Sequence, residues 1–137
     1  RGLGDVYKRQ APNREVCTVT RERTNTPLQA LVLLNDPQFV EASRALADRI
    51  SSESTVEERI NKGFRLVLSR QPSRDEKNVL VQLYEKELAF FQEDPLRAEE
   101  FLAVGDYEPT YAGQEELAAL TVVANTLYNM DEAYMKR

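Results

Sequence analysis

Two helix starts follow one another in the stretch Thr24-Asn25-Thr26-Pro27-Leu28-Gln29-Ala30-Leu31-Val32-Leu33-Leu34-Asn35-Asp36-Pro37. In each start an oxygen-bearing side chain, Thr26 or Asp36, precedes a proline. This order suits an N-cap followed by the first helical position, where the missing N–H of proline costs nothing. The stretch therefore predicts a short helix that ends near Leu34 and a second helix that begins at Pro37.

Similar helix starts recur farther along the chain. Residues 26–29, 54–57 and 73–76 each fit a capping box, in which a Ser or Thr and a Glu or Gln three residues later satisfy each other's backbone amides. Each box opens a segment whose apolar residues recur at helical spacing. The sequence therefore predicts an all-α chain, an irregular bundle of about six helices with no β-sheet.

The apolar spacing also predicts where these helices lie. We expect helices at 37–51, 55–69, 73–93 and 95–105, with Val79 in the apolar stripe of the third of these. The first, 37–51, leaves Glu41, Arg44, Asp48 and Arg49 outside its apolar stripe. A last helix after Gly113 is apolar almost all round, which predicts a central position.

Composition restricts the class of protein. The 137 residues are 42% hydrophobic and 30% charged, enough for one globular domain. A formal net charge of -5 argues against a nucleic-acid partner, because phosphate contacts need clustered Lys and Arg. No apolar run is long enough for a membrane span. We expect an adaptor-derived or disordered leader at 1–10, the C-terminal part of one helical domain at 11–132, and a tail at 133–137.

The chain contains one cysteine, Cys17, and no histidine. Histidine is the commonest metal ligand and the commonest general base in proteins. A Cys–His nucleophile, a Ser–His–Asp triad, a Cys-x-x-Cys-His haem attachment and a histidine-ligated metal site therefore cannot be built from these residues. We predict no catalytic residue, no metal and no cofactor in this chain.

Polar residues at the first helix junction and in the last helix form one candidate site. They are Asn25, Gln29, Asn35, Asp36, Asn125 and Asn129. A buried amide without a hydrogen-bond partner costs about 1 to 3 kcal/mol, so these side chains must find partners. They either line a ligand pocket or serve as caps and inter-helix hydrogen bonds, and we favour the second interpretation because most buried polar groups are simply satisfied.

The long loop at 105–113 forms the other candidate site, because loops carry function more often than helices do. Its candidate residues are Asp106, Tyr107, Glu108 and Tyr111. The acidic residues lack the alternating spacing of a calcium loop, so a solvated acidic face is the simpler interpretation. Arg70 and Arg74 lack the Gly-rich turn of a phosphate site, and we expect them to pair with acidic helices.

Several motifs are characteristic of a known family. They are Ala11-Pro12-Asn13-Arg14-Glu15-Val16-Cys17, Arg23-Thr24-Asn25-Thr26-Pro27-Leu28-Gln29-Ala30-Leu31 and Leu34-Asn35-Asp36-Pro37. On these motifs the chain resembles the C-terminal domain of unknown function of planctomycete-type cytochrome-associated proteins. The resemblance extends from residue 11 to residue 132, and residues 24–31 are its most specific part.

The resemblance implies a context and no chemistry. Such proteins are exported, so an extracytoplasmic (periplasmic) location is expected. They often carry a c-type haem module in an upstream domain, so upstream domains of the same polypeptide are the expected partners and haem c the expected cofactor of the full-length protein. The family offers no catalytic residues to transfer to this sequence.

Three functional hypotheses follow. The leading one is a helical structural or interaction portion of a larger exported cytochrome-associated protein. The alternative is part of a hydrolytic or carbohydrate-active enzyme, to which Asp106, Glu108 or Asp36 contributes a carboxylate in a shared cleft. A weaker alternative is calcium or glycan binding by the 105–113 loop.

Overall fold

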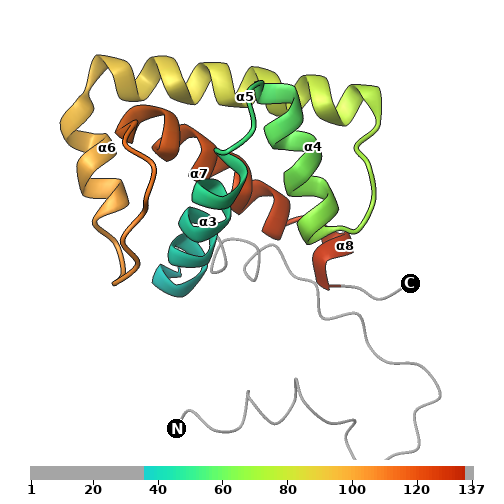
Figure 1. Ribbon diagram of the computed structural model, residues 1–137, viewed down its shortest axis with the longest axis horizontal. Helices are drawn as coiled ribbons and strands as arrows, with labels where there is room; N and C mark the ends of the chain where they lie inside the picture. Colours follow the sequence, from blue (N-terminus) through green and yellow to red (C-terminus); the bar gives the residue numbers. More distant parts are fainter. Residues whose placement is uncertain (1–35, 135–137) are drawn as a thin grey trace, which may run out of the picture.

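A computed structural model describes residues 36–134 of the chain (Figure 1). Over this range the chain forms six α-helices and no strand, which confirms the predicted all-α fold. The helices are α3 (Pro37–Ile50), α4 (Val56–Val67), α5 (Arg74–Glu93), α6 (Pro95–Leu102), α7 (Gln114–Tyr128) and α8 (Asp131–Tyr134). The helix predicted to end near Leu34 lies outside the described residues. Among the described helices, none combines the length and the apolar character that crossing a bilayer requires.

The helix starts follow the predicted chemistry. Asp36 is the N-cap of α3, its carboxylate accepts from the backbone N–H of Gln38 at 2.9 Å, and Pro37 occupies the first turn. Ser73 and Glu76 form the predicted capping box of α5, with each side chain bonded to the backbone N–H of the other residue. These caps satisfy amides that would otherwise have no partner at the helix start.

The capping box of α4 differs from the prediction by one residue. Thr55 is the N-cap, its hydroxyl accepts from Glu58 N at 3.3 Å, and the Glu58 carboxylate accepts from Thr55 N at 3.2 Å. The predicted pair of Ser54 and Glu57 is therefore wrong. Both registers fit the tetrapeptide pattern, but in the fold Glu57 forms an ion pair with Lys77 of α5, which leaves the capping role to Glu58.

The helices are arranged around α7. In Figure 1, α5 runs along one side of the molecule, and α4 and α6 fold back from its two ends. Helix α7 lies between α5 and α3 and contacts α3, α4, α5 and α6. This central position, predicted from its nearly continuous apolar surface, is confirmed, since nine of its residues are buried.

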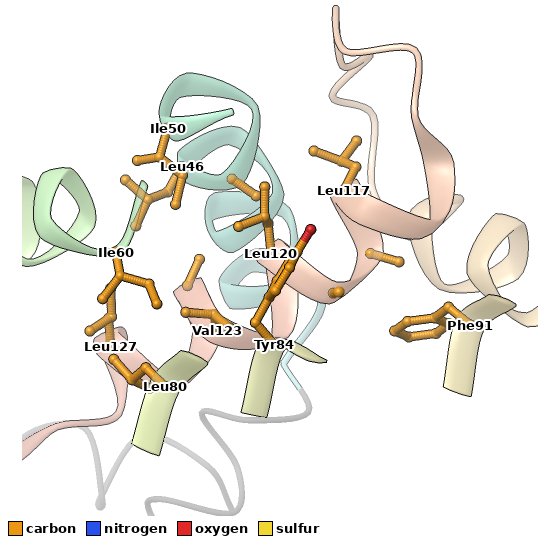
Figure 2. Packing of buried hydrophobic residues seen from close by; sticks show 14 of the residues in the cluster. Leu46, Ile50, Ile60, Leu80, Tyr84, Phe91, Leu117, Leu120, Val123 and Leu127 are labelled. Carbon is orange, nitrogen blue, oxygen red and sulfur yellow. The ribbon is translucent and has the colours of Figure 1, made fainter. Parts of the chain in front are cut away.

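The hydrophobic core consists of side chains that gather round α7 (Figure 2). Leu120 and Leu127 of α7 meet Ile50 of α3, Ile60 of α4 and Tyr84 of α5, all of them buried. Each large side chain buried in such a core stabilises the fold by about 1.5 to 3 kcal/mol. These side chains therefore join α3, α4 and α5 to the central helix α7.

Two residues, Gly63 and Val79, show how the packing of the helices determines which side chains fit at each position. A Cβ at Gly63 of α4 would lie 2.9 Å from Cδ1 of Leu127, so the absence of a side chain lets α4 approach α7. Val79 was predicted in the apolar stripe of α5, but it is 63% exposed. Because α5 buries Leu80, Tyr84 and Phe91 against the core, Val79 lies off the buried face.

Candidate functional site

One carboxylate, Asp48 of α3, fastens the 105–113 loop to the helical bundle. Tyr107 Oη donates to Asp48 Oδ2 at 2.8 Å. Thr110 donates to the same oxygen through Oγ1 at 2.8 Å and through its backbone N–H at 3.2 Å. The backbone N–H of Tyr111 donates to Asp48 Oδ1 at 2.9 Å. Three loop residues thus share one acceptor group on α3.

The electrostatics of Asp48 indicate a structural anchor. Partial burial by itself raises the pKa of this carboxyl, but the hydrogen bonds from Thr110, Tyr107 and Tyr111 outweigh it and hold the pKa below its ordinary value. The hydrogen bond to Asp48 in turn raises the pKa of the Tyr107 hydroxyl. A general base or acid works best with a pKa near the operating pH. The lowered pKa moves Asp48 away from neutral pH, so its oxygens serve as hydrogen-bond acceptors rather than as a proton-transfer group.

The start of the loop is fixed by a second carboxylate of α3. Glu41 Oε1 accepts from the backbone N–H of Asp106 at 3.2 Å. The preceding residue, Gly105, has a φ of 84°, and a Cβ there would lie 2.9 Å from Cδ of Glu41. Only glycine suits this position, because a side chain would be strained by the backbone angle and would meet Glu41.

The end of the loop is fixed to α4 and α7. Tyr111 Oη donates to Glu116 Oε2 at 2.5 Å, and Arg59 of α4 approaches the same oxygen at 3.4 Å. The Arg59 guanidinium also lies 5.8 Å from the centre of the Tyr111 ring, within range of a cation–π contact. The hydrogen bond to Glu116, followed by burial, raises the pKa of Tyr111. The loop therefore has fixed contacts with three helices.

Arg44 is the unexpected member of this site. The sequence placed it outside the apolar stripe of α3, whereas it is only 2% exposed. Its Cζ lies 5.9 Å from the centre of the Tyr107 ring, and its Nε and Nη2 have no hydrogen-bond partner within residues 36–134. The expected exposed position of Arg44 was wrong because this polar face of α3 packs against the 105–113 loop, which is distant only in the sequence.

Sequence reasoning therefore missed the two residues at the centre of the site, Arg44 and Asp48. The signal that could have found them is their spacing with Glu41, because residues at i, i+3 and i+7 share one face of a helix. A charged stripe of this kind is usually solvated. Nothing in its local sequence distinguishes a solvated stripe from one that binds a loop.

The candidate residues of the loop separate into two groups. Tyr107 and Tyr111 contact the bundle through Asp48 and Glu116, as described above. Asp106 and Glu108 are exposed, and no hydrogen bond or ion pair of their carboxylates is formed within residues 36–134. The structure therefore brings the tyrosines, and not the two carboxylates, into the site.

The polar candidates of the helices are only partly described. Asn25, Gln29 and Asn35 lie outside the described residues. Asp36 caps α3, as described above. Near the end of α7, Asn129 Nδ2 donates to the backbone oxygen of Asn125 at 2.8 Å and to its Oδ1 at 3.1 Å. The contact between the junction residues and this asparagine pair stays a prediction.

Arg70 has the pairing role predicted for it. Its Nη1 and Nη2 donate to the two carboxylate oxygens of Glu76 at 2.8 and 2.6 Å, and its Nε donates to Glu132 at 2.7 Å. These hydrogen bonds raise the pKa of Arg70, and those from Arg70 and then Ser73 lower the pKa of Glu76 to about 2. Arg70 thus connects the α4–α5 junction with α8.

The surface of the described bundle also contains a hollow of about 280 Å³ between α3 and α7. Its lining residues are Ala42, Ala45, Leu46, Arg49 and Tyr128. Within residues 36–134, no group of three or more Asp, Glu, Cys or His residues is placed to hold a metal ion. The hollow is therefore chiefly an apolar surface with one arginine.

Comparison with known proteins gives a family. No curated protein and no solved structure matches the chain significantly. A family model described as "PSD1: Protein of unknown function (DUF1553)" matches residues 7–84, which is more than half of the 137 residues and includes Asp48, Arg44 and Glu41. The chain therefore belongs to the PSD1 family of proteins of unknown function (DUF1553).

Proposed function

We propose that this chain is a helical structural and interaction portion of a larger exported cytochrome-associated protein. The observation that carries the proposal is the use of polar groups in the loop, because Tyr107 and Tyr111 bond to Asp48 and Glu116 and so hold helices together. A carboxylate that accepts several hydrogen bonds at a lowered pKa is poorly suited to proton transfer. Of the carboxylates named in the hydrolytic alternative, Asp36 caps α3, and Asp106 and Glu108 are exposed on the loop. These placements favour an interaction role over the hydrolytic alternative.

The hollow between α3 and α7 is the surface that we propose for docking. Three of its lining residues, Ala42, Ala45 and Leu46, are apolar, and Arg49 adds one positive charge. Covering apolar surface stabilises a contact by about 25 cal/mol per Å². The proposed occupant is therefore an apolar segment from the upstream part of the same polypeptide, with an acidic residue opposite Arg49.

The exported location and the association with a cytochrome are supported by the resemblance of residues 24–31 to planctomycete-type proteins of this kind. The genomic reading frame upstream of residue 11 tests this context. We expect a signal peptide and a Cys-x-x-Cys-His haem attachment in that frame, and a c-type haem absorbance in the periplasmic fraction of the expressed protein. A frame without either feature contradicts the proposed context but leaves the docking role to be tested separately.

Hydrogen exchange tests the docking role. We expect amides around Ala45 and Tyr128 to exchange more slowly in the full-length protein than in the 137-residue chain. Ala45→Arg should remove that difference, because the new side chain fills the hollow with charge. Leu96→Arg on α6 is the matched control, since Leu96 is 71% exposed and lies outside the hollow.

Circular dichroism should show that both variants keep their helices. Equal exchange around Ala45 in the full-length protein and in the 137-residue chain would contradict the docking role. So would an equal loss of protection in Ala45→Arg and Leu96→Arg.

A further inference from the structure

Arg44 carries two buried nitrogen atoms that have no hydrogen-bond partner within the described range. Its side chain is 2% exposed, and the unpartnered atoms are Nε and Nη2. A guanidinium remains protonated in proteins, so the buried group carries a full positive charge. Buried charges are normally paired, because burial removes their hydration and a partner must replace it. The free edge of Arg44 therefore calls for a partner of opposite charge.

The two nitrogens are the pair that an arginine uses to hold one oxyanion. Nε–H and Nη2–H lie on the same edge of the planar guanidinium and point in the same direction. This fork donates two parallel hydrogen bonds to the two oxygens of a carboxylate. Unpartnered atoms at unrelated positions would indicate only loose packing, whereas a complete fork has the geometry of a binding site.

The nearest carboxylates along α3 already have other partners. Glu41 and Asp48 lie about one turn to either side of Arg44, on the same face of the helix. Glu41 accepts from the backbone of Asp106, and Asp48 accepts from the loop side chain Tyr107 and from its neighbours. Among residues 36–134, neither carboxylate forms an ion pair with Arg44. Tyr107 covers one face of the guanidinium, so the edge remains for another group.

We propose that the fork of Arg44 binds one carboxylate group and that Tyr107, with the 105–113 loop, covers it. The local charge favours a monoanion, because Glu41 and Asp48 repel a dianion such as phosphate more strongly. A planar carboxylate also matches the two parallel N–H groups. Its source is either a small free acid or an acidic side chain of the protein. The inference does not depend on the docking role of the α3–α7 hollow.

Nuclear magnetic resonance of the ¹⁵N-labelled 137-residue chain tests the proposal. The observed signal is Nε–H of Arg44, assigned by its loss in Arg44→Lys, and Nε–H of the exposed Arg65 on α4 is the internal control. Sodium acetate is the probe, and sodium chloride at the same ionic strength is its control. A small free acid as the source predicts a saturable shift of the Arg44 signal with acetate and a smaller shift with phosphate.

Arg44→Lys provides the matched variant, because lysine keeps the charge and loses the fork. We expect it to weaken acetate binding about tenfold, as read from the backbone amide of Tyr107. Arg65→Lys should leave the affinity unchanged. Saturable acetate binding of equal affinity in the wild-type chain and in Arg44→Lys would overturn the proposal.

The same spectra identify the other source. If an acidic side chain occupies the fork, Nε–H of Arg44 exchanges slowly in acetate-free buffer and gives a nuclear Overhauser contact to the methylene protons of an Asp or Glu. That outcome supports the proposal and names the residue. The proposal is refuted if Nε–H of Arg44 exchanges as fast as that of Arg65 and does not shift with acetate. It is also refuted if Nε–H of Arg44 exchanges slowly but shows nuclear Overhauser contacts only to water.

Discussion

Replacing Asp48 by asparagine should detach the 105–113 loop from α3. The carboxylate accepts from Tyr107, from both donors of Thr110 and from the backbone of Tyr111 at 2.8 to 3.2 Å. Asn keeps one acceptor oxygen and places an NH₂ group where the other oxygen was. In the variant, the NH₂ group of the asparagine therefore faces at least one N–H or O–H donor of the loop, and that hydrogen bond is lost.

The magnitude follows from the hydrogen bonds that the variant loses. Each hydrogen bond to a charged group contributes about 1.5 to 3 kcal/mol, and a neutral one about 1 kcal/mol. The variant loses the hydrogen bonds at one oxygen and the negative charge at the other, which together lower the stability by about 2 to 3 kcal/mol. The released loop regains part of this loss as conformational entropy. We expect the free energy of unfolding to fall by about 2 kcal/mol. With a urea dependence of about 2 kcal/mol per molar, the midpoint falls by about 1 M.

Urea unfolding followed by circular dichroism measures this change, and Asp106→Asn is the matched control. Asp106 lies in the same loop, but only its backbone bonds to α3 within the described residues. Hydrogen exchange of the Thr110 and Tyr111 amides should become faster in Asp48→Asn and stay unchanged in Asp106→Asn. Unchanged exchange at both amides, together with an unchanged midpoint, would refute the anchoring role of Asp48.

The pH dependence gives a second reading of the same contact. The folded-state pKa of Asp48 is lowered from its ordinary value of 3.8, so its contribution is complete above that value and is lost as the pH falls through the folded-state pKa. Asp48→Asn should therefore lose less stability than the wild-type chain when the pH is lowered below about 4. An equal loss in the two proteins would contradict the cause assigned to this pKa.

Three further predictions concern the helices. Because Thr55 is the N-cap of α4, Thr55→Ala should lower the free energy of unfolding by about 1 kcal/mol and Ser54→Ala by much less, as measured by urea midpoints. A larger effect of Ser54→Ala would instead indicate that Ser54 and Glu57 form the capping box. Gly63→Val should cost about 2 kcal/mol in the same assay, because even a Cβ at this position would lie 2.9 Å from Cδ1 of Leu127, whereas the exposed control Asn78→Val should cost little. Glu76→Gln should remove about 1 kcal/mol of stability at pH 6, discounted for solvent exposure, and much less at pH 2, because the pKa of Glu76 falls from 4.5 unfolded to about 2 folded. Midpoints compared across that range check the last expectation, and a constant difference would contradict it.

Much of the fold could be predicted because helix signals are local. The start of α3 needs only Asp36 and Pro37, and the start of α5 needs only Ser73 and Glu76, since the bonded groups lie within one turn. The central position of α7 follows from its apolar residues on nearly all sides. The start of α4 was wrong by one residue because two overlapping tetrapeptides fit the same pattern, and only the contact of Glu57 with Lys77 separates them.

The candidate site could be predicted only in part. The loop and its two tyrosines were found, because glycines and the gap in helical spacing mark the segment. Asp106 and Glu108 were proposed with them, but a loop sequence does not tell which side chains turn toward the bundle. The structure describes only Asp36, Asn125 and Asn129 of the six polar helix candidates, so the meeting of that group stays a prediction.

The sequence by itself determined that this chain is helical, where most helices begin, and which helix lies at the centre, because caps and apolar spacing act within a few residues. Only the tertiary structure decided that the charged face of α3 holds a loop and buries Arg44. Asp48 and Thr110 are 62 residues apart, so no local pattern connects them. Helical spacing separates apolar from polar faces, and the packing of the whole chain then determines whether a polar face meets water or another segment.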